Sequence, residues 1–224
     1  MGTWSMSELF DKKVAESYDL WYETKRGARY DLYEKKLMVR LLSPQRGETL
    51  LDVGCGTGNL LLFLNNTGVK TVGIDPSPYM LGKARGKLRE KTPLVQARAE
   101  ELPFKDKSFD MLILVTTLEF VDDPRQAIKE AFRVTRERIF LGVLNAFSPL
   151  AVFRRVRGKF KRSIYNRARF YSLWGLTALI RSSISSLTYR LRWAGLLPFP
   201  LNPFSSFLGV IIYLNKDNGE SSKK

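Results

Sequence analysis

The stretch Leu51-Asp52-Val53-Gly54-Cys55-Gly56-Thr57-Gly58-Asn59 decides the fold, because it joins a short apolar run to a glycine-rich turn. The run Thr49–Val53 predicts a buried strand, and the apolar residues from Leu60 to Leu64 open a helix. Glycines after a strand let the chain turn tightly and bring its backbone against a ligand, while the following helix presents free N–H groups. The stretch therefore predicts a ligand site at the carboxyl end of a buried strand.

Strand-like and helix-like segments alternate on both sides of this turn. We expect helices over Ser7–Thr24, Tyr30–Leu42, Ser77–Arg89, Asp123–Val134 and Ser172–Arg181. We expect further strands over Lys70–Ile74, Leu94–Ala97, Phe109–Val115, Arg138–Val143, Leu187–Trp193 and Phe207–Asn215. The alternation predicts βαβ units and a mostly parallel sheet, and the proline-rich link between the last two strands predicts that they close it as an antiparallel pair.

The glycine spacing helps to separate two classes of nucleotide cofactor. The pattern here is G-x-G-x-G, whereas dinucleotide enzymes favour G-x-G-x-x-G to seat a pyrophosphate. A carboxylate at Asp52 is awkward for a phosphate ligand but suits a cofactor that carries a positive sulfonium and an ammonium. Asp75, which ends the next strand, can accept hydrogen bonds from both hydroxyls of a ribose, a role that both cofactor classes share.

Three stretches, Leu51–Gly58, Val72–Met80 and Ala99–Phe104, resemble those of small-molecule methyltransferases related to the ubiquinone and menaquinone biosynthesis enzymes. The resemblance covers roughly Phe10 to Val143. It implies a class I, Rossmann-like α/β fold whose sheet is seven-stranded and mostly parallel, with helices on both faces. It also implies S-adenosylmethionine as methyl donor and S-adenosylhomocysteine as product.

The resemblance assigns cofactor positions residue by residue. The glycines of the turn would line the methionine portion, Asp75 would hold the ribose, and Tyr18 would cover the donor. The full set of expected cofactor-binding residues is Tyr18, Asp52, Gly54, Cys55, Gly56, Gly58, Asp75, Pro76, Met80, Ala99, Glu100, Thr116 and Leu118. Two positions depart from the family: Arg98 stands where an acidic residue usually accepts from the adenine amine, and Glu119 follows Thr117-Leu118 where a histidine is common.

We divide the chain into one domain with four parts. Residues 1–45 form an N-terminal helical cap, 46–145 the cofactor-binding core, 146–183 a basic insertion over the acceptor site, and 184–216 the closing antiparallel strands.

Methyl transfer from a sulfonium needs a base only when the acceptor must lose a proton, since positioning supplies most of the catalysis. Glu119 is the candidate base, because it lies just past the fourth strand, where the ligand crevice of an α/β sheet opens. An exposed acid that caps or flanks a helix is an equally good interpretation. Tyr22 is a weaker candidate for the acceptor region and would more often simply pack.

The charge of the chain is unevenly distributed. The 224 residues carry a formal net charge of +15, yet residues 1–137 are close to neutral with 22 basic and 20 acidic side chains. From Arg138 to Lys216 there are 13 basic residues and no acidic one. Such asymmetry predicts an anionic partner, and Arg154, Arg155 and Arg157 are expected to roof the acceptor site.

Several acceptors and partners fit that basic segment. We expect an anionic or amphiphilic small molecule. RNA or an anionic membrane surface also fits the interleaved arginines and aromatic residues. The chain could then be an RNA methyltransferase, or a non-catalytic module that binds RNA or membrane; a solvated face without a ligand is the remaining interpretation.

Cysteine and histidine are informative through their scarcity. One cysteine and no histidine are present, so we expect a reducing, cytoplasmic compartment and no metal site. The uncharged stretch Ala194–Asn215 is long enough to span a membrane, but it contains three prolines. We therefore interpret it as a loop and a strand, and expect no transmembrane segment.

Overall fold

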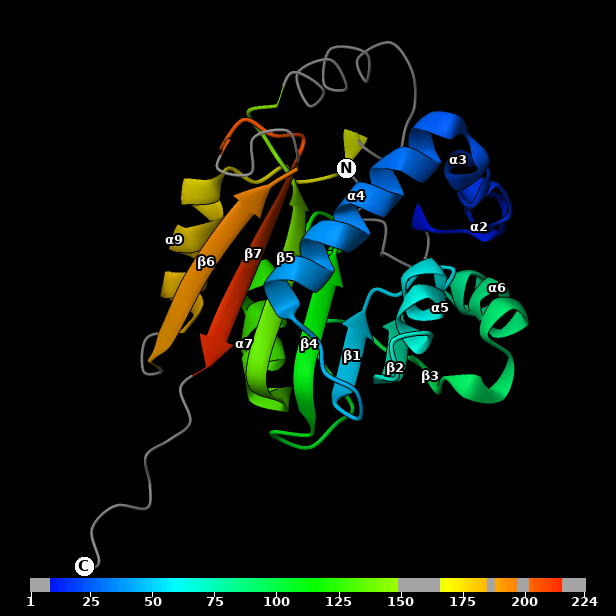
Figure 1. The fold of residues 1–224 in the computed structure, drawn as a ribbon, viewed down its shortest axis with the longest axis horizontal. Helices are drawn as coiled ribbons and strands as arrows, with labels where there is room; N and C mark the ends of the chain where they lie inside the picture. The colour runs from blue at the N-terminus through cyan, green and yellow to red at the C-terminus, as the bar shows by residue number, and fades with distance from the viewer. Residues whose placement is uncertain (1–8, 149–165, 185–187, 197–201, 215–224) are drawn as a thin grey trace, which may run out of the picture.

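The structure is a computed structural model that describes residues 9–148, 166–184, 188–196 and 202–214. Its centre is a seven-stranded sheet in the order β3-β2-β1-β4-β5-β7-β6, which confirms the predicted fold class (Figure 1). The strands are β1 (Thr49–Val53), β2 (Lys70–Asp75), β3 (Leu94–Gln96), β4 (Phe109–Val115), β5 (Thr135–Leu144), β6 (Tyr189–Gly195) and β7 (Phe207–Leu214). The first five run parallel, and β7 lies antiparallel between β5 and β6.

Helices cover both faces of the sheet (Figure 1). They are α2 (Lys12–Tyr18), α3 (Leu20–Glu23), α4 (Lys25–Leu42), α5 (Asn59–Asn65), α6 (Pro78–Leu88), α7 (Pro124–Val134) and α9 (Leu173–Ser183), with a 3₁₀ turn at Arg89–Lys91. Helix α4 packs its buried residues Leu37, Met38 and Leu42 against the β4–β5–β7 part of one face. Helices α7 and α9 pack on the other face, so alternate strand residues serve separate cores, with Phe140 facing α4 and Ile139 facing α7 and α9.

The first predicted helix is divided in two at Asp19. The carboxylate of Asp19 accepts hydrogen bonds from Thr57 Oγ1 at 2.7 Å and Asn59 Nδ2 at 3.0 Å, and it pairs with Lys87 Nζ at 2.7 Å. This side chain therefore ties the N-terminal helices to the glycine turn and to α6. Periodicity could not predict the break, because the partners of Asp19 lie 38, 40 and 68 residues further along the chain.

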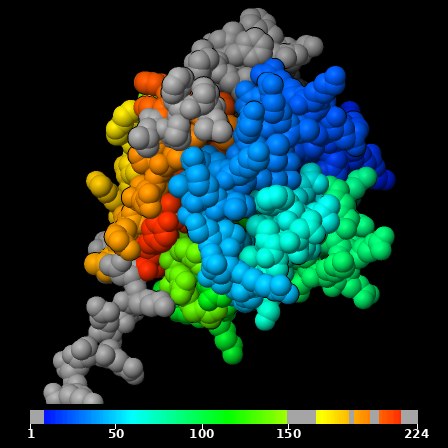
Figure 2. Space-filling model, in the orientation of Figure 1, coloured from blue at the N-terminus to red at the C-terminus, as the bar shows by residue number. Residues whose placement is uncertain are grey.

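Helix α4 begins at Lys25, five residues before the predicted start. Thr24 caps it through Oγ1, which accepts from Gly27 N at 3.0 Å. Gly27 is required here, because a Cβ at this position would lie 1.8 Å from the carbonyl oxygen of Trp21. This glycine therefore lets α3 and α4 pack together. In Figure 2 the side chains of α2, α3 and α4 form one continuous surface, shown in blue.

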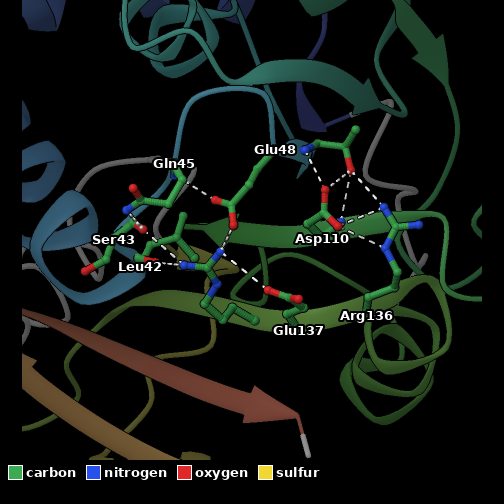
Figure 3. A network of polar contacts seen from close by, with 9 residues as sticks. Leu42, Ser43, Gln45, Glu48, Asp110, Arg136 and Glu137 are labelled. Carbon is green, nitrogen blue, oxygen red and sulfur yellow. Dashed lines mark hydrogen bonds and ion pairs between the residues drawn. The ribbon is translucent and has the colours of Figure 1, made fainter. Parts of the chain in front are cut away.

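A polar network holds the far end of α4, at the amino ends of β1 and β4 (Figure 3). Arg138 donates from Nη1 to the carbonyl oxygens of Leu42 at 2.9 Å and Ser43 at 3.0 Å, and its Nη2 pairs with Glu48. Beside it, Arg136 pairs with Asp110, which also accepts from Thr49. The network fixes the C-terminus of α4 to the sheet, and thereby the position of the whole helix.

Candidate functional site

The glycine turn follows β1 in a conformation that glycine adopts at little cost. Gly54, Gly56 and Gly58 have φ values of 78°, 54° and 79°. A Cβ on Gly54 would lie 2.5 Å from Thr117 Oγ1, whereas a Cβ on Gly56 would meet no atom within 4 Å. Gly54 is therefore needed for close packing against the segment after β4. Gly56 leaves its backbone open to a ligand.

Asp52 is buried beneath the turn with an oxygen that lacks a partner. The residue is 2% exposed, and its Oδ2 has no hydrogen bond to any described residue. Burial, together with the negative charge of Asp75, raises the pKa of the Asp52 carboxyl to about 8. A buried carboxyl without a partner either stays neutral or needs a cationic group beside it.

Asp75 ends β2 and braces the turn. Its Oδ2 accepts from Gly56 N at 2.9 Å, and its Oδ1 accepts from Ser77 N at 2.8 Å. Burial raises the pKa of Asp75 to about 6, against the lowering effect of these two hydrogen bonds. Each oxygen keeps a second lone pair, so the carboxylate can still accept from a hydroxyl group.

A cavity of about 380 Å³ lies between the carboxyl ends of β1, β4 and β5 and the helices α2–α4. Its volume falls in the range of small-molecule sites. Seven of the predicted site residues line it: Tyr18, Tyr22, Asp52, Gly54, Cys55, Gly56 and Thr116. The remaining lining is Val14, Ser17, Trp21, Asp31, Glu34, Lys35, Met38, Thr57, Asn59, Leu60, Val115, Phe140, Leu144 and Phe207.

Two phenylalanine rings of the lining lie over a pair of facing glycines in the sheet. Gly142 of β5 and Gly209 of β7 are directly opposite one another. A Cβ on Gly142 would lie 2.5 Å from Phe207 Cζ, and a Cβ on Gly209 would lie 3.0 Å from Phe140 Cε2. The rings fill the space that the missing side chains leave, so these glycines determine how far the rings extend into the cavity.

Seven predicted cofactor residues do not line this cavity: Gly58, Asp75, Pro76, Met80, Ala99, Glu100 and Leu118. Met80, Ala99 and Leu118 are buried in apolar clusters instead. Glu100 anchors a loop, because its Oε1 accepts from Asp122 N at 2.8 Å and Asp123 N at 3.3 Å and pairs with Arg98. Most of the residues predicted for the methionine side of the cofactor site thus line the cavity, whereas those predicted for the ribose and the adenine lie outside its lining.

Glu119, the candidate base, is fully buried behind the cavity wall. Its Oε1 accepts from the backbone N–H of Leu144, which does line the cavity, at 2.6 Å. Its Oε2 has no hydrogen bond to any residue in the described ranges. Burial is the main cause that raises the pKa of Glu119 to about 8. The interpretation of Glu119 as an exposed acid is wrong, since its exposed fraction is 0%.

The sequence did not indicate that α4 would contribute to the cavity. Asp31, Glu34, Lys35 and Met38 all line it, and they lie at positions i, i+3, i+4 and i+7 of one helical face. That spacing was available as a signal, but two acids and a lysine on an amphipathic helix are usually read as a solvated face. Asp31 Oδ2 and Lys35 Nζ are 2.6 Å apart.

Arg154, Arg155 and Arg157, predicted to roof the acceptor site, lie outside the described residues. Within the described ranges, no cluster of three or more His, Cys, Asp or Glu side chains is placed to hold a metal ion. No helix in these ranges combines the length and apolarity needed to cross a membrane.

Comparisons with known proteins point to methyltransferases. Residues 51–141 match the model of a family described as a methyltransferase domain. The chain is 32% identical over 170 residues to an uncharacterized protein of Methanocaldococcus jannaschii. The matched segment covers 73% of this chain and 74% of that protein. It is 30% identical over 188 residues to the ubiquinone/menaquinone biosynthesis C-methyltransferase UbiE of Vibrio vulnificus, covering 79% of this chain and 68% of that enzyme.

Among solved structures, the chain is similar to an S-adenosylmethionine-dependent methyltransferase of Thermotoga maritima described as a possible histamine N-methyltransferase. The TM-score is 0.74 at 26% identity, covering 93% of this chain and 99% of that one.

Proposed function

Because the chain belongs to the class I S-adenosylmethionine-dependent methyltransferases related to UbiE, we propose that its cavity holds the methionine portion of that donor beside a small-molecule acceptor. The donor supplies an electrophilic methyl group on a positively charged sulfur. What this chain supplies is the binding of the donor and the placement of an acceptor nucleophile in line with that methyl group.

The residues around the turn fit the donor. The partnerless Oδ2 of buried Asp52 is the single observation that carries the proposal, because the amino group of a methionine portion would complete it. The open side of Gly56 allows a ligand to lie directly against the backbone. Asp75 would accept from the ribose hydroxyls through its remaining lone pairs.

The adenine end of the donor would lie beyond the cavity, among Pro76, Met80 and Ala99. We assign Glu100 a supporting role there, because its carboxylate already accepts the N–H groups of Asp122 and Asp123. A backbone carbonyl is then the better acceptor for the adenine amine.

We propose an amphiphilic acceptor for this cavity. Phe140, Leu144, Phe207 and Met38 give its deep side an apolar surface, while carboxylate and phenol groups stand at the helical side. One protein named above is described as a ubiquinone/menaquinone biosynthesis C-methyltransferase and another as a possible histamine N-methyltransferase. Ubiquinone, menaquinone and histamine each combine a ring with polar groups. The expected anionic class depends on Arg154, Arg155 and Arg157 and gains no support from the described lining.

Glu119 stays the proposed base of the site. Its raised pKa of about 8 lies near neutral pH, so once this carboxyl has lost its own proton it is basic enough to accept one from an acceptor. Its carboxylate lies behind Leu144, so a proton would reach it through a rearrangement of that wall or through a chain of hydrogen bonds.

The cytoplasm stays the proposed compartment, since the lone Cys55 is a buried thiol.

RNA methylation and a non-catalytic role in binding RNA or membrane are the rival functions. Both rest on the basic residues from Arg138 onward. RNA methylation would use the same donor and therefore the same Asp52 site, whereas a non-catalytic module does not account for the buried oxygen of Asp52. Binding of the donor without turnover of any acceptor would favour the non-catalytic alternative.

Titration calorimetry with S-adenosylmethionine and S-adenosylhomocysteine tests the donor site. Wild-type protein should bind both, and Asp52→Asn should weaken binding by roughly 1.5–3 kcal/mol, the worth of a hydrogen bond between charged groups. Asp110→Asn is the matched control, because Asp110 makes its contacts to Thr49 and Arg136 in the network at the other end of the sheet. An absence of binding by the folded wild-type protein would refute the proposed function.

A further inference from the structure

We propose that three exposed aromatic side chains at the carboxyl end of the sheet form a surface that docks on a lipid bilayer with anionic headgroups. The three are Phe147, Trp174 and Phe204, which we call the aromatic surface, and they are 52%, 60% and 55% exposed. Large apolar side chains that gather on a surface mark a site for a partner or a membrane, because their contact with water is unfavourable. The inference goes beyond the proposed function and does not depend on it.

One buried amide group brings two of these residues together. Asn145 follows β5 and is fully buried. Its Oδ1 accepts from Phe147 N at 3.1 Å. Its Nδ2 donates to the carbonyl oxygens on either side of Phe204, those of Pro203 at 2.6 Å and Ser205 at 2.7 Å. The turn after β5 and the loop before β7 are therefore held against each other at the end of the sheet (Figure 1).

Trp174 extends this surface from the first turn of α9. Its ring centroid lies 6.2 Å from that of Phe147, with the two planes inclined at 58°. The start of α9 is attached to the same turn after β5, because the carbonyl oxygen of Tyr171 accepts from Ala146 N at 3.0 Å. Three segments that are distant in the sequence therefore bring their aromatic side chains to one end of the molecule.

The loop before β7 offers apolar rather than polar groups to a partner. Residues 194–206 contain no charged side chain. Two of the polar side chains are used inside the fold, since Asn202 Oδ1 accepts from Phe204 N at 2.9 Å and Ser205 Oγ accepts from Leu196 N at 2.8 Å. A surface for single-stranded RNA interleaves its aromatic rings with groups that bind phosphate. An uncharged loop with exposed rings instead suits the boundary between the headgroups and the acyl chains of a bilayer.

The charge around the aromatic surface has the sign that suits anionic headgroups. The described segments that carry it contain two arginines, Arg167 and Arg169, and no acidic residue. These segments are residues 145–148, 166–174 and 202–206. Arg169 donates to the carbonyl oxygens of Val121 and Asp122, and within the described ranges no carboxylate forms an ion pair with it. Anionic lipids attract such basic side chains to the membrane surface, so charge and apolar contact favour the same partner.

The aromatic surface lies beside the cavity. Leu144 and Phe207, which line the cavity, are the neighbours in sequence of the turn and the loop that carry Phe147 and Phe204. A protein docked through this surface would therefore hold its cavity close to the headgroups. The contact would be peripheral, since no helix of the described part of the chain is long and apolar enough to cross a membrane.

Flotation with lipid vesicles tests the inference. Wild-type protein should partition onto vesicles of equal parts phosphatidylcholine and phosphatidylglycerol, and more weakly onto phosphatidylcholine alone. Trp174→Gln with Phe204→Gln should lower the partition coefficient about tenfold or more, because two rings no longer enter the bilayer. Leu32→Gln with Leu62→Gln is the matched control. It removes two side chains of α4 and α5 that are each 45% exposed, and it should partition as wild type does.

Any of four results would overturn the inference. These are absence of wild-type protein from anionic vesicles, equal partitioning onto the two kinds of vesicle, equal partitioning of wild type and the ring variant, or an equal loss in the control variant. Polyuridine binding that depends on the two rings, without binding to vesicles, would assign the surface to RNA. A dimer in sedimentation that the ring variant abolishes, again without binding to vesicles, would assign it to a second copy of the chain.

Binding of S-adenosylhomocysteine shows that each variant is folded, because none of the four substituted residues lines the cavity. If the double variant does not fold, Phe204→Gln alone provides the same comparison from a loop. Failure of the wild-type protein to bind S-adenosylhomocysteine is a separate result, which would refute the proposed function and leave the docking surface standing.

Discussion

Asp52 links the binding of the donor to pH. Its carboxyl is buried without a partner on Oδ2, and its pKa is raised to about 8 by burial and by Asp75. If the ionised form meets the amino group of the donor, then the protein must release a proton from Asp52 before or during binding. Below about pH 8 this release costs affinity, and above it the cost disappears.

We therefore expect the affinity for S-adenosylhomocysteine to rise between about pH 6.5 and 8, by at most about tenfold per pH unit, and then to level off. Calorimetry in two buffers of different ionisation enthalpy would detect the released proton. Asp75→Asn should shift the rise to lower pH, because the charge of Asp75 helps to raise the pKa of Asp52. Affinity that does not change over this range in the wild-type protein would contradict the role of Asp52.

Glu119 should make the fold less stable as pH increases. Its pKa is raised in the folded protein to about 8, against 4.5 for an unperturbed glutamate, so the folded state holds a proton that the unfolded chain releases. Its contribution to stability is complete below about pH 4.5 and is lost as the pH rises toward 8.

Glu119→Gln should keep the hydrogen bond from Leu144 N, since the amide oxygen can accept it. The variant should lose less unfolding free energy than wild type when urea unfolding at about pH 6 is compared with about pH 8.5. Equal pH profiles for the two proteins would mean that Glu119 does not titrate as its burial implies. If the variant also keeps full turnover on the true acceptor, Glu119 is not the base.

Helix α4 is the element that joins the stability of the molecule to its site. Its C-terminus is held by Arg138, while its middle turns carry Asp31, Glu34 and Met38 into the cavity lining. Arg138 is largely buried with Glu48 and leaves an uncompensated carboxylate if it is removed.

Arg138→Met should lower the free energy of unfolding by about 3 kcal/mol, as for other buried ion pairs that lose one partner. The neighbouring Arg136 is a suitable comparison, because its side chain is 43% exposed in its pair with Asp110. Arg136→Met should cost about 1 kcal/mol or less. Urea denaturation of both variants measures the difference. Equal losses of unfolding free energy would argue against the role of Arg138 in holding the C-terminus of α4.

The β5–β7 pair sets the size of the cavity through its facing glycines. Gly142→Ala would bring a methyl group to 2.5 Å from Phe207 Cζ, so the ring must move, and it lines the cavity. We expect this variant to bind S-adenosylhomocysteine as wild type does but to lose affinity for acceptor analogues that carry a ring, such as phenethylamine and hydrocinnamate. Gly82→Ala is the control, because its Cβ on α6 would meet no atom within 4 Å. If a folded Gly142→Ala protein binds these analogues with unchanged affinity, the Phe207 ring moves without changing the size of the cavity.

At the scale of the whole molecule, the charge of the chain and the charge of its cavity have opposite signs. The net charge is +15, while the cavity lining contains more carboxylates than ammonium groups. The basic residues should therefore act on large polyanions rather than on the acceptor. We expect binding to a polyuridine RNA that weakens steeply with salt.

The triple variant Arg154→Glu, Arg155→Glu, Arg157→Glu should lose most RNA binding while the affinity for S-adenosylhomocysteine stays the same. Fluorescence anisotropy at low and high salt, with calorimetry of the cofactor as control, measures both. RNA that competes with S-adenosylhomocysteine would instead place the polyanion at the cavity and support the RNA alternative.

The sequence predicted the fold well because its signals are local. Buried strands such as Phe109–Val115 are short apolar runs, and Asp123-Pro124 marks the start of α7 through the side chain of Asp123, which accepts from Arg125 N and Gln126 N. The donor end of the site was predictable for the same reason, since the glycine turn is one continuous stretch. The acceptor end was not, because it is assembled from separate elements. Nothing near Asp31 or Glu34 in the sequence shows that this part of α4 reaches the cavity at the carboxyl ends of the strands.

The position of β7 has a consequence for how the protein forms during synthesis. This strand is made after β6, yet it lies between β5 and β6. Until Phe207–Leu214 leaves the ribosome, β5 presents an unpaired edge, and β6 has no partner in the sheet. We expect the first five strands to collapse early and to wait, with the apolar edge of β5 open to chaperones or to other nascent chains. A ribosome stalled just before Phe207 would therefore leave a nearly complete intermediate that is prone to aggregation.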